Sequence, residues 1–333
     1  MEKIVYTSRT ISAKTILEMD IKEYPTLLDG IIPMKGIAAL AGSSDLGKSY
    51  LLQQLSVAVA SGAEEFLDFK LNIKKQSVLY ISTEDDDYAM GLRLYHLKNL
   101  GTEEGMTNLN FLFKAEDLIN TIENELKINP VSLIVMDAFA DVFRGALNDS
   151  ISVRRFMEPF KTIAQDHECV IIFNHHCGKH NQYKIPGKDN LLGSQGLESS
   201  MRTVIELRQD LHEENKRHLC IVKGNNMGIE NKNKSFELVF DFEKGFSNTG
   251  QRCNFQDLVL HKNSHKANDL EAKIFKLREE GFNSSRKIAA ALKEQNGPLA
   301  GKSKVAEILK RNLEQSIRND DENSIKKGPE LNE

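Results

Sequence analysis

The sequence of 333 residues contains only four cysteines, and none of them belongs to a Cys-x-x-Cys pair. They are Cys169, Cys177, Cys220 and Cys253. Because these cysteines are scattered along the chain, neither a disulfide framework nor a zinc site is indicated. A reducing compartment is the simplest setting for such a sequence, and we expect a cytoplasmic protein.

Long apolar runs are absent as well. No stretch approaches the roughly 18 consecutive apolar residues that a membrane-spanning helix needs. The segment MEKIVYTSRTISAKTILEMD at residues 1–20 lacks the apolar core of a signal peptide. With 40% hydrophobic and 28% charged residues, the composition is that of an ordinary globular protein, and we expect no membrane partner.

A strong excess of one charge is also lacking, because the formal net charge is only −4. This charge is unevenly distributed. Residues 261–313 contain 12 Lys or Arg and 6 Asp or Glu, residues 314–333 contain 3 and 6, and residues 1–260 carry a net −7. A basic segment beside an acidic body indicates a separate module, for which nucleic acid is the usual partner. The alternative is a solvated, lysine-rich helical face.

Between residues 36 and 242, short apolar runs alternate with longer stretches of helical pattern. Most of these runs lack polar alternation, which is typical of strands buried on both faces by crossover helices. The expected strands are 37–42, 77–83, 109–113, 132–137, 169–175, 202–208, 219–224 and 236–242, and the main expected helices are 48–62, 88–101 and 152–167. This order predicts an α/β fold with a mainly parallel, twisted sheet whose last strands are joined by hairpins.

The β pattern ends at about residue 245. Beyond it we expect three short helices, at 268–281, 284–297 and 301–312, with Ser284 as an N-cap and with Gly281 and Gly297 as C-terminal stops. The chain is therefore divided into an N-terminal segment (1–24), an α/β domain (25–250), a basic helical module (262–313) and a disordered tail (314–333).

The segment GSSDLGKS has the spacing of a phosphate-binding loop. It follows a predicted strand and opens a predicted helix, which is the structural context that supports the motif. In such a loop backbone N–H groups surround the phosphates, Lys48 reaches the β and γ oxygens, and Ser49 binds Mg²⁺. The expected nucleotide-binding residues are Gly42, Ser43, Ser44, Asp45, Leu46, Gly47, Lys48, Ser49 and Tyr50.

Asp45 is unusual in this loop, because it brings a negative charge to the place of a triphosphate. It lies in the variable part of the motif, where backbone amides bind and side chains can point outward. We expect Asp45 to face outward, toward an adjacent subunit.

Two acidic residues follow other predicted strands. The strand SLIVMD ends in Asp137, which suits the orientation of Mg²⁺ or its water at the carboxyl edge of the sheet. Glu84, in VLYISTEDD, suits the polarisation of an attacking water. The alternative for the acidic run TEDDD is a solvated turn.

A histidine pair, His175 and His176, ends the strand VIIFNHH. One interpretation is a sensor of the γ-phosphate at the same edge of the sheet. The alternatives are a structural pair and a metal site formed by His176, Cys177 and His180, although tetrahedral ligand spacing is lacking.

Together, these segments resemble the RecA-like hexameric ATPases, most closely the branch that contains the RepA-type plasmid replicative helicases. The resemblance covers roughly residues 25–245. It rests on the order and spacing of YPTLLDGIIPMKGIAALAGSSDLGKSYLLQQLSVAVASG, VLYISTEDDDYAMGLRLYHLKNLG, LIVMDAF, IIFNHHCGK, GSQGLESSMRTVIEL and VKGNNMG. It implies a RecA-like P-loop NTPase core that hydrolyses ATP with Mg²⁺ in a homo-oligomer, expected to be a hexamer.

The resemblance also implies roles for single residues. Glu84 falls on the catalytic base, His175 and His176 fall on a double histidine, and Arg202 falls on an arginine that reaches a neighbouring subunit's nucleotide. Such an arginine stabilises charge on the transferring phosphate. In VKGNNMG, Lys223 matches a family lysine, whereas Asn225 stands where DnaB-type helicases have a second basic residue. Arg202 is therefore the better candidate, with a surface ion pair as its alternative.

The loop 178–196 lies where RecA-like rings project DNA-binding loops into the central channel. Lys179, Lys184 and Lys188, with Tyr183 for stacking, suit a single strand of DNA that is held by its backbone. The alternative is an ordinary surface loop.

The basic module resembles a helix-turn-helix or winged-helix domain. One helix opens at Ser284, the chain breaks at NGPLAG, and a second helix begins with Lys302 and Lys304, where duplex DNA would be contacted. The alternative is a helical module for oligomerisation or for binding a loader protein.

The leading hypothesis is thus an ATP-dependent DNA motor or helicase of a plasmid or another mobile element. One alternative is an ATP-controlled, DNA-binding initiator or regulator that does not unwind DNA. A recombinase-like filament is another.

Overall fold

The computed structural model describes residues 10–178, 180–193, 195–224, 231–260, 264–294 and 301–310. The chain forms two compact units, Met1–Val259 and Leu260–Glu333. The predicted tail 314–333 lies outside the described residues. So do two single residues named above, Lys179 and Gly297.

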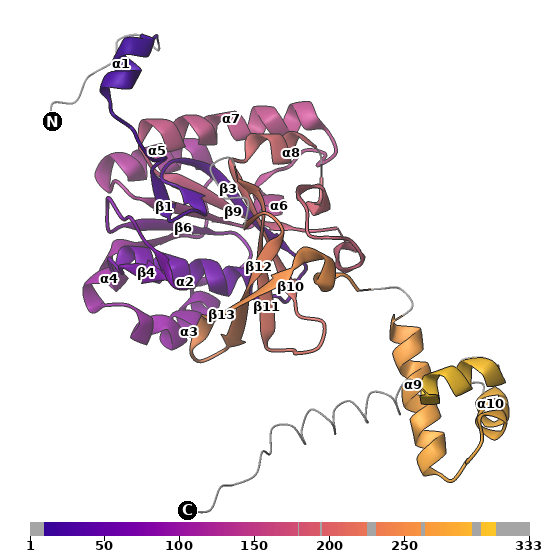
Figure 1. Cartoon of the computed structure of the whole chain (residues 1–333). Helices are drawn as coiled ribbons and strands as arrows, with labels where there is room; N and C mark the ends of the chain where they lie inside the picture. The colour runs from indigo at the N-terminus through magenta and orange to yellow at the C-terminus, as the bar shows by residue number, and fades with distance from the viewer. Residues whose placement is uncertain are drawn as a thin grey trace, which may run out of the picture. The chain divides into compact units, whose positions relative to one another are not determined.

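The first unit is built on one large sheet, whose described strands follow the order β13-β12-β11-β10-β3-β9-β8-β6-β7 (Figure 1). The strands from β10 to β7 in this order are parallel. They are β3 (Gly36–Gly42), β6 (Val78–Ser82), β7 (Leu109–Leu112), β8 (Leu133–Asp137), β9 (Val170–His176) and β10 (Thr203–Gln209). Every residue of β3, β6 and β8 is buried. The predicted α/β fold with a mainly parallel sheet is confirmed.

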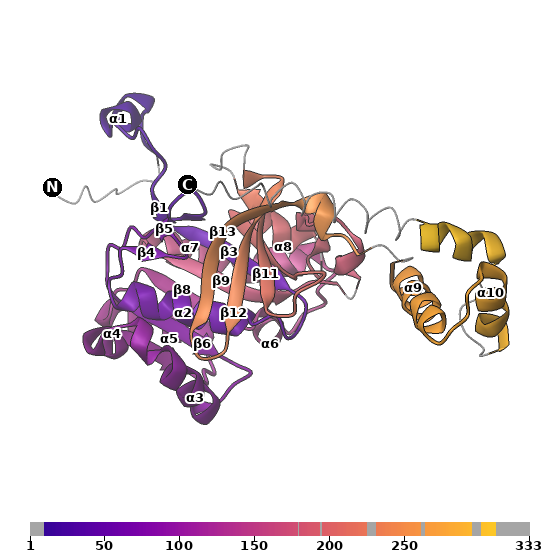
Figure 2. The same cartoon turned by 60° about the horizontal axis from the view of Figure 1, so that its bottom comes forward.

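Three antiparallel strands complete the sheet: β11 (Lys216–Gly224), β12 (Lys234–Asp241) and β13 (Gly245–Asn254). They lie side by side in Figure 2. The predicted hairpins between the late strands are confirmed, whereas the predicted end of β structure at about residue 245 is wrong. The sequence of β13, GFSNTGQRCN, is polar and mostly exposed or half-buried, so no apolar run marks it. Its pairing with β12 makes it a strand.

Helices cover both faces of the sheet (Figure 1). One apolar core lies under α2 (Lys48–Ala60), α3 (Asp87–Leu97) and α4 (Glu103–Asn108). A second core lies on the other face, under α5 (Leu118–Ile128), α7 (Ser150–Asp166) and α8 (Gln195–Ser200). The sheet is therefore the middle layer of three.

The remaining elements of this unit are short. They are α1 (Ala13–Glu18), α6 (Phe139–Val142), β1 (Thr26–Leu28) paired with β2 (Ile32–Pro33), β4 (Glu65–Phe66) paired with β5 (Phe69–Lys70), and the 3₁₀ turns η1 (Lys98–Leu100), η2 (Asn181–Tyr183), η3 (Lys188–Asn190) and η5 (Phe255–Leu258). Across the described ranges, no helix combines the length and the apolar character that crossing a membrane requires.

In its described part, the second unit contains α9 (Ser264–Glu279), α10 (Ser285–Glu294) and a helical segment at residues 302–310. These helices share a small apolar core that includes Ile274 and Val305. The Ser284 hydroxyl accepts a hydrogen bond from the Lys287 N–H at 3.3 Å, so the predicted N-cap is confirmed. Gly281 follows α9 with a φ of +98°, as expected for a C-terminal stop.

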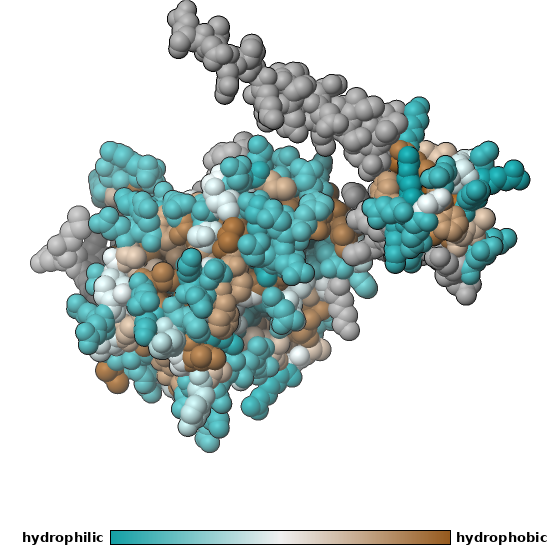
Figure 3. All heavy atoms as spheres, turned by 90° about the horizontal axis from the view of Figure 1, so that it is seen from below, coloured by the Kyte–Doolittle hydropathy of each residue, from teal (hydrophilic) through white to brown (hydrophobic). Residues whose placement is uncertain are grey.

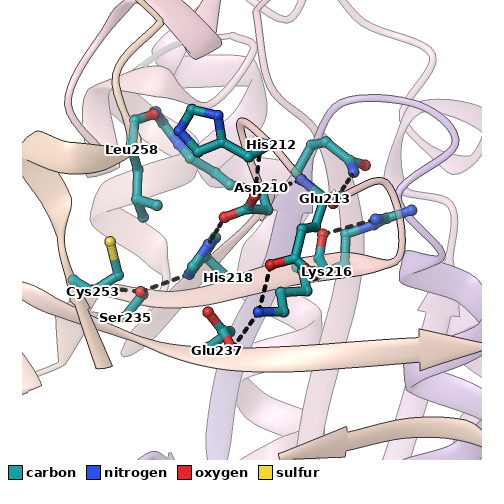
Figure 4. Close-up of polar contacts among 12 residues, drawn as sticks. Asp210, His212, Glu213, Lys216, His218, Ser235, Glu237, Cys253 and Leu258 are labelled. Atoms are coloured by element: carbon teal, nitrogen blue, oxygen red, sulfur yellow. Dashed lines mark hydrogen bonds and ion pairs between the residues drawn. The ribbon is translucent and has the colours of Figure 1, made fainter. Parts of the chain in front are cut away.

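A chain of largely buried polar contacts joins the residue after β10 to β11, β12 and β13 (Figure 4). His218 Nε2 lies 2.9 Å from Asp210 Oδ2, and His218 Nδ1 lies 3.1 Å from Ser235 Oγ. The Ser235 hydroxyl donates to the Cys253 carbonyl at 3.2 Å. The order Asp, His, Ser is that of a hydrolase triad, but Ser235 is fully buried and gives its proton to a carbonyl. The cluster therefore ties strands together and does not attack a substrate.

The carboxylate of Asp210 is held in its charged form. Partial burial raises its pKa, but hydrogen bonds with His218 and with the backbone N–H groups of His212 and Glu213 outweigh that effect and lower the pKa to about 2. Because the folded-state pKa lies below the ordinary value of 3.8, the carboxylate stabilises the fold above that pH. This contribution is lost as the pH falls toward 2.

We expect Asp210→Asn to lower the free energy of unfolding by about 1 to 2 kcal/mol at neutral pH, since it removes a charged acceptor that solvent partly screens. Urea unfolding followed by circular dichroism measures this loss. The difference from the wild type should shrink as the pH falls from about 4 to 2.

Glu213→Gln is the matched control in the same hairpin. Glu213 Oε1 lies 2.8 Å from Lys216 Nζ in a surface ion pair in which the Glu213 side chain is 55% exposed, and such a pair contributes little to stability. Equal losses in the two variants, or a loss for Asp210→Asn that is the same at every pH, would contradict the role assigned to Asp210.

Candidate functional site

The phosphate-binding loop lies between the carboxyl end of β3 and the start of α2. A Cβ at Gly42 would lie 2.7 Å from the Leu207 carbonyl of β10, so close packing excludes a side chain there. Gly47, the N-cap of α2, has a φ of +84°, which other residues rarely adopt. The first N–H groups of α2 are thereby free to bind an anion.

A cavity of about 410 Å³ opens at this loop. Its size suits a small ligand such as a nucleotide. It is lined by Ser44, Asp45, Gly47, Lys48, Ser49, Tyr50, Glu84, Arg93, Asn174, His176, Phe240 and Phe242. The structure therefore brings most of the predicted loop together with Glu84 and His176.

Lys48 is a buried cation in this cavity. Its Nζ donates a hydrogen bond to the Ser43 carbonyl at 2.6 Å. Burial lowers the pKa of the ammonium, and nearby groups, Cys177 and Asp137 first among them, act in the opposite direction. Since charge-assisted hydrogen bonds to phosphate are stronger than those to a carbonyl, Lys48 is positioned to turn to a phosphate oxygen.

Asp137 and Ser49 are joined through Asn174. Asn174 Nδ2 lies 2.5 Å from Asp137 Oδ1 and 3.2 Å from Ser49 Oγ, and the buried Tyr80 hydroxyl donates to Asp137 Oδ2. Asn174 Oδ1 is buried and has no hydrogen-bond partner among the described residues. An unpaired oxygen beside a carboxylate and a hydroxyl fits Mg²⁺, which prefers oxygen ligands. Ser49 and Asp137 would hold the ion, which would neutralise charge on the β- and γ-phosphates.

Glu84 follows β6, whose last residue, Ser82, pairs in register with Asp137. Partial burial raises the pKa of Glu84, and the carboxylates of Asp137, Asp141 and Asp85 raise it further. A carboxylate with a raised pKa is a stronger base, which suits proton abstraction from water.

The two histidines of β9 lie on opposite faces of the sheet, because side chains alternate along a strand. His176 pairs in register with Gly42 and lines the cavity. His175 is buried elsewhere: its Nε2 lies 2.5 Å from the Leu192 carbonyl, and its ring packs edge-on against Phe139. Burial lowers the pKa of His175 to about 4, and burial also lowers that of His176. Of this pair, only His176 lines the cavity at the phosphate-binding loop.

The alternative metal site at His176, Cys177 and His180 gains no support from the geometry. Over the part of the chain that the structure describes, no group of three or more His, Cys, Asp or Glu side chains could hold a metal ion. Cys177 is buried, and burial raises the pKa of its thiol to about 12, which disfavours the thiolate that a metal would need.

Arg202 lies at the opposite end of the sheet from the cavity. Its N–H donates to the Ile37 carbonyl at 2.8 Å, and a Cβ at Gly36 would lie 3.0 Å from its Cδ. Because β10 and β3 are parallel, Arg202 is at the amino ends of both strands, about 20 Å along the sheet from the phosphate-binding loop. This exposed side chain cannot reach the cavity of its own subunit. Lys223 forms an ion pair with Glu198 at 2.8 Å, and Asn225 lies outside the described residues.

The cavity also contains Arg93, Phe240 and Phe242, which the sequence did not single out as site residues. Arg93 of α3 lines it and forms an ion pair with Asp85 at 2.5 Å. Tyr50, Phe240 and Phe242 form an aromatic wall, in which the Tyr50 hydroxyl donates to the Phe242 carbonyl at 2.7 Å. Phe242 is 53% exposed, and its flat surface suits a nucleobase. The run FELVFDF marked a strand, but no local signal indicated that this strand would meet α2.

The loop 178–193 is tied to the phosphate-binding loop by side chains. The Ser43 hydroxyl donates to Asn181 Oδ1 at 3.0 Å, and Asn181 Nδ2 donates to the buried carboxylate of Glu206 at 3.2 Å. Glu206 also accepts from Asn190 Nδ2 at 3.1 Å and from the Gly187 N–H at 3.0 Å. The carboxylate of Glu206 therefore holds the loop through hydrogen bonds from three of its residues.

The predicted DNA contacts are exposed where the structure describes them. Lys184 and Lys188 lie on the surface of the loop, and Lys188 also forms a 3.5 Å ion pair with Glu198. Lys302 and Lys304 are exposed at the start of the helical segment 302–310 of the second unit. Lys304 Nζ also forms a 3.0 Å ion pair with Glu307 Oε1, an exposed contact that a phosphate group could replace.

Asp45 has a φ of +63°, a conformation that aspartate tolerates better than most residues do. Its side chain is exposed, as an outward-facing residue would be, yet it also lines the cavity. We expect Asp45→Gly to tighten the binding of an ATP analogue by about fivefold. The substitution removes a negative charge that repels the triphosphate, and water weakens this repulsion. Titration with a fluorescent ATP analogue measures the affinity.

Asp45→Asn is the matched control, because it removes the charge and keeps a side chain that tolerates this backbone conformation. The two variants should tighten binding to a similar extent. Unchanged affinity in both would mean that the carboxylate does not face the phosphates.

The comparison with protein families agrees with this geometry. A family model described as an AAA domain matches residues 10–182, which is more than half of the chain and includes the phosphate-binding loop, Glu84, Asp137 and His176. Among curated proteins, none matches the chain. The chain therefore belongs to the AAA domain family AAA_25 of P-loop ATPases.

Proposed function

We propose that this protein is an ATP-hydrolysing motor that moves single-stranded DNA and acts as a helicase of a plasmid or another mobile element. It would work in the cytoplasm as a ring of identical subunits, with six as the expected number, and with one ATP and one Mg²⁺ at each site. This proposal extends the resemblance of the sequence to the RepA-type replicative helicases.

The position of Arg202 is the observation that carries the proposal. The arginine that the resemblance assigns to hydrolysis is exposed and lies at the amino edge of the sheet, whereas the cavity lies at the carboxyl edge. An arginine so placed acts on the nucleotide of another copy or not at all. This placement supports hydrolysis at subunit interfaces, as in enzymes that receive an arginine in trans.

In the proposed reaction, Lys48 and the first N–H groups of α2 bind the β- and γ-phosphates. Glu84 accepts a proton from the attacking water, which its raised pKa favours. His176 stays neutral at pH 7, because its pKa is lowered, and it can share a hydrogen bond with the γ-phosphate. Arg202 of the next subunit stabilises the charge that develops on the transferring phosphate.

An exposed apolar stripe on α3 supports assembly into an oligomer. Tyr88, Leu92 and Tyr95 are 85%, 59% and 63% exposed and recur at the spacing of one helix face. Figure 3 shows the molecule from below, relative to the view of Figure 1. On this side, apolar residues interrupt a largely hydrophilic surface. Burial of such a stripe against another copy would remove apolar area from water.

The second candidate function is an ATP-controlled initiator or regulator that binds duplex DNA without unwinding it. The compact second unit favours it, because Ser284 caps α10 and the exposed Lys302 and Lys304 begin the following helical segment. Such a protein would hydrolyse ATP without stimulation by single-stranded DNA.

Glu84→Gln is expected to lower the turnover of ATP by about 10²- to 10⁴-fold, because the amide cannot accept a proton from water. In the wild type, kcat/KM should fall as Glu84 becomes protonated, at a pH above its ordinary pKa of 4.5, since the pKa in the protein is raised. A steady-state pH profile of phosphate release measures both effects. An acid limb at or below pH 4.5, or a variant with normal turnover, would rule out Glu84 as the base.

Mixing two inactive variants tests the proposal as a whole. Lys48→Ala and Arg202→Ala should each lose at least about 10³-fold in turnover. In an equal mixture, an interface that combines the intact loop of an Arg202→Ala subunit with Arg202 of a Lys48→Ala subunit should recover activity. Recovery should be larger when single-stranded DNA is present.

The outcomes separate the candidate functions. Recovery that single-stranded DNA increases, together with rings in electron micrographs, supports the motor. Recovery without any effect of single-stranded DNA favours the regulator. A mixture that stays as inactive as its components contradicts hydrolysis at subunit interfaces.

A further inference from the structure

A second cavity, of about 570 Å³, lies in the first unit between the loop 178–193 and η5. Ile185 and Pro186 line it from the loop, Phe255 lines it from η5, and Val222 lines it from β11. None of these residues lines the cavity at the phosphate-binding loop.

The lining combines neutral hydrogen-bonding groups with apolar surface. Asn233, Asn254 and Gln256 contribute three amides, and Lys232 contributes a cation. Among the described residues that line the cavity, none is a carboxylate. Asn254 Nδ2 donates to Asp257 Oδ2 at 3.2 Å, which orients this amide. Amides offer donors and acceptors side by side, the pattern that matches the edge of a nucleobase, while Pro186 and Phe255 offer apolar contact to its faces.

A buried ion pair holds the walls of this cavity in place. Arg208 and Glu206 are both buried and lie 2.9 Å apart. Arg208 Nη1 donates to the carbonyls of Lys184 at 2.6 Å and Leu258 at 3.4 Å, and Glu206 accepts from the Gly187 N–H at 3.0 Å. The residues on both sides of Ile185 and Pro186, and the end of η5, are thereby fixed. A cavity with fixed walls needs little ordering when a ligand binds.

We propose that this cavity receives one unstacked base of a single-stranded nucleic acid, whose phosphates run past the exposed Lys184 and Lys232. Only an unpaired strand can turn a base out of its stack at small cost, so a duplex would not fit. The inference rests on the proposed function, which assigns single-strand binding to the loop 178–196, and it adds a site for the base to contacts with the phosphates.

Filling the cavity tests the assignment. Val222→Trp would occupy the space of the base without changing any charge. We expect it to weaken the binding of a labelled oligothymidylate to the full chain by about tenfold, with an unchanged salt dependence. Lys232→Ala should weaken binding as well, and the slope of log K against log salt should fall by about 0.7. Fluorescence anisotropy at several salt concentrations measures both.

Ile151→Trp is the matched control for an added tryptophan, because Ile151 is 71% exposed on α7. Because Val222 is half-buried, its replacement can disturb folding, so a second measurement uses the wild type: an oligonucleotide that contains 5-iodouracil should crosslink to residues 185–186 or 254–256.

Two results would overturn the assignment. Crosslinks that form only elsewhere, or a folded Val222→Trp that binds DNA as tightly as the wild type, would remove the cavity from the path of the strand and leave the proposed function intact. A wild-type chain that hydrolyses ATP but binds no oligothymidylate would overturn both the DNA part of the proposed function and the cavity.

Discussion

The parallel pairing of β3 with β9 and β10 is the constraint on which the rest of the structure depends. Its register puts His176 beside Gly42, and the continued pairing of β8 with β6 puts Asp137 beside Ser82, just before Glu84. Strands that run in one direction thus bring their chemically active ends to one edge. The same parallel pairing places the amino end of β10 beside the amino end of β3. Arg202, which precedes β10, is therefore separated from the cavity by the length of a strand. In the proposed motor, the need for a second subunit is a consequence of strand direction.

Buried charges are used in two different ways. Glu206 and Arg208 pair with each other and bond to several backbone groups, and these contacts fix the loop 178–193 and η5. Lys48 is buried beside an open cavity with a carbonyl as partner, and its lowered pKa reports the loss of hydration. A charge pair that bonds to neighbouring backbone groups gives rigidity, whereas a cation that would gain from a stronger acceptor gives a binding site.

Much of this fold was predictable, because apolar runs mark buried strands and the spacing of Gly42, Gly47 and Lys48 marks a phosphate loop. What escaped prediction depends on tertiary packing. β13 has no apolar run, Arg93 belongs to no recognisable motif, and Phe242 gained its place beside Tyr50 only when β12 met α2. The histidine pair shows the limit of motif reading. Both residues end one strand, but alternation along that strand sends His175 into the core and leaves His176 at the cavity.

The two cavities are joined by an unbroken path of hydrogen bonds. Ser43 in the phosphate-binding loop bonds to Asn181, Asn181 bonds to Glu206, and Glu206 holds the walls of the second cavity. Lys48 now donates to the Ser43 carbonyl, so a phosphate that draws this ammonium away changes the residue at which the path begins. Under the proposed function, a nucleotide in one cavity and a base in the other would both bias the position of Asn181. Because such coupling is reciprocal, a strand in the second cavity would alter nucleotide affinity by the same factor by which a nucleotide alters the affinity for the strand. A motor needs such coupling between nucleotide binding and DNA binding. In this protein the coupling would pass through the buried carboxylate of Glu206.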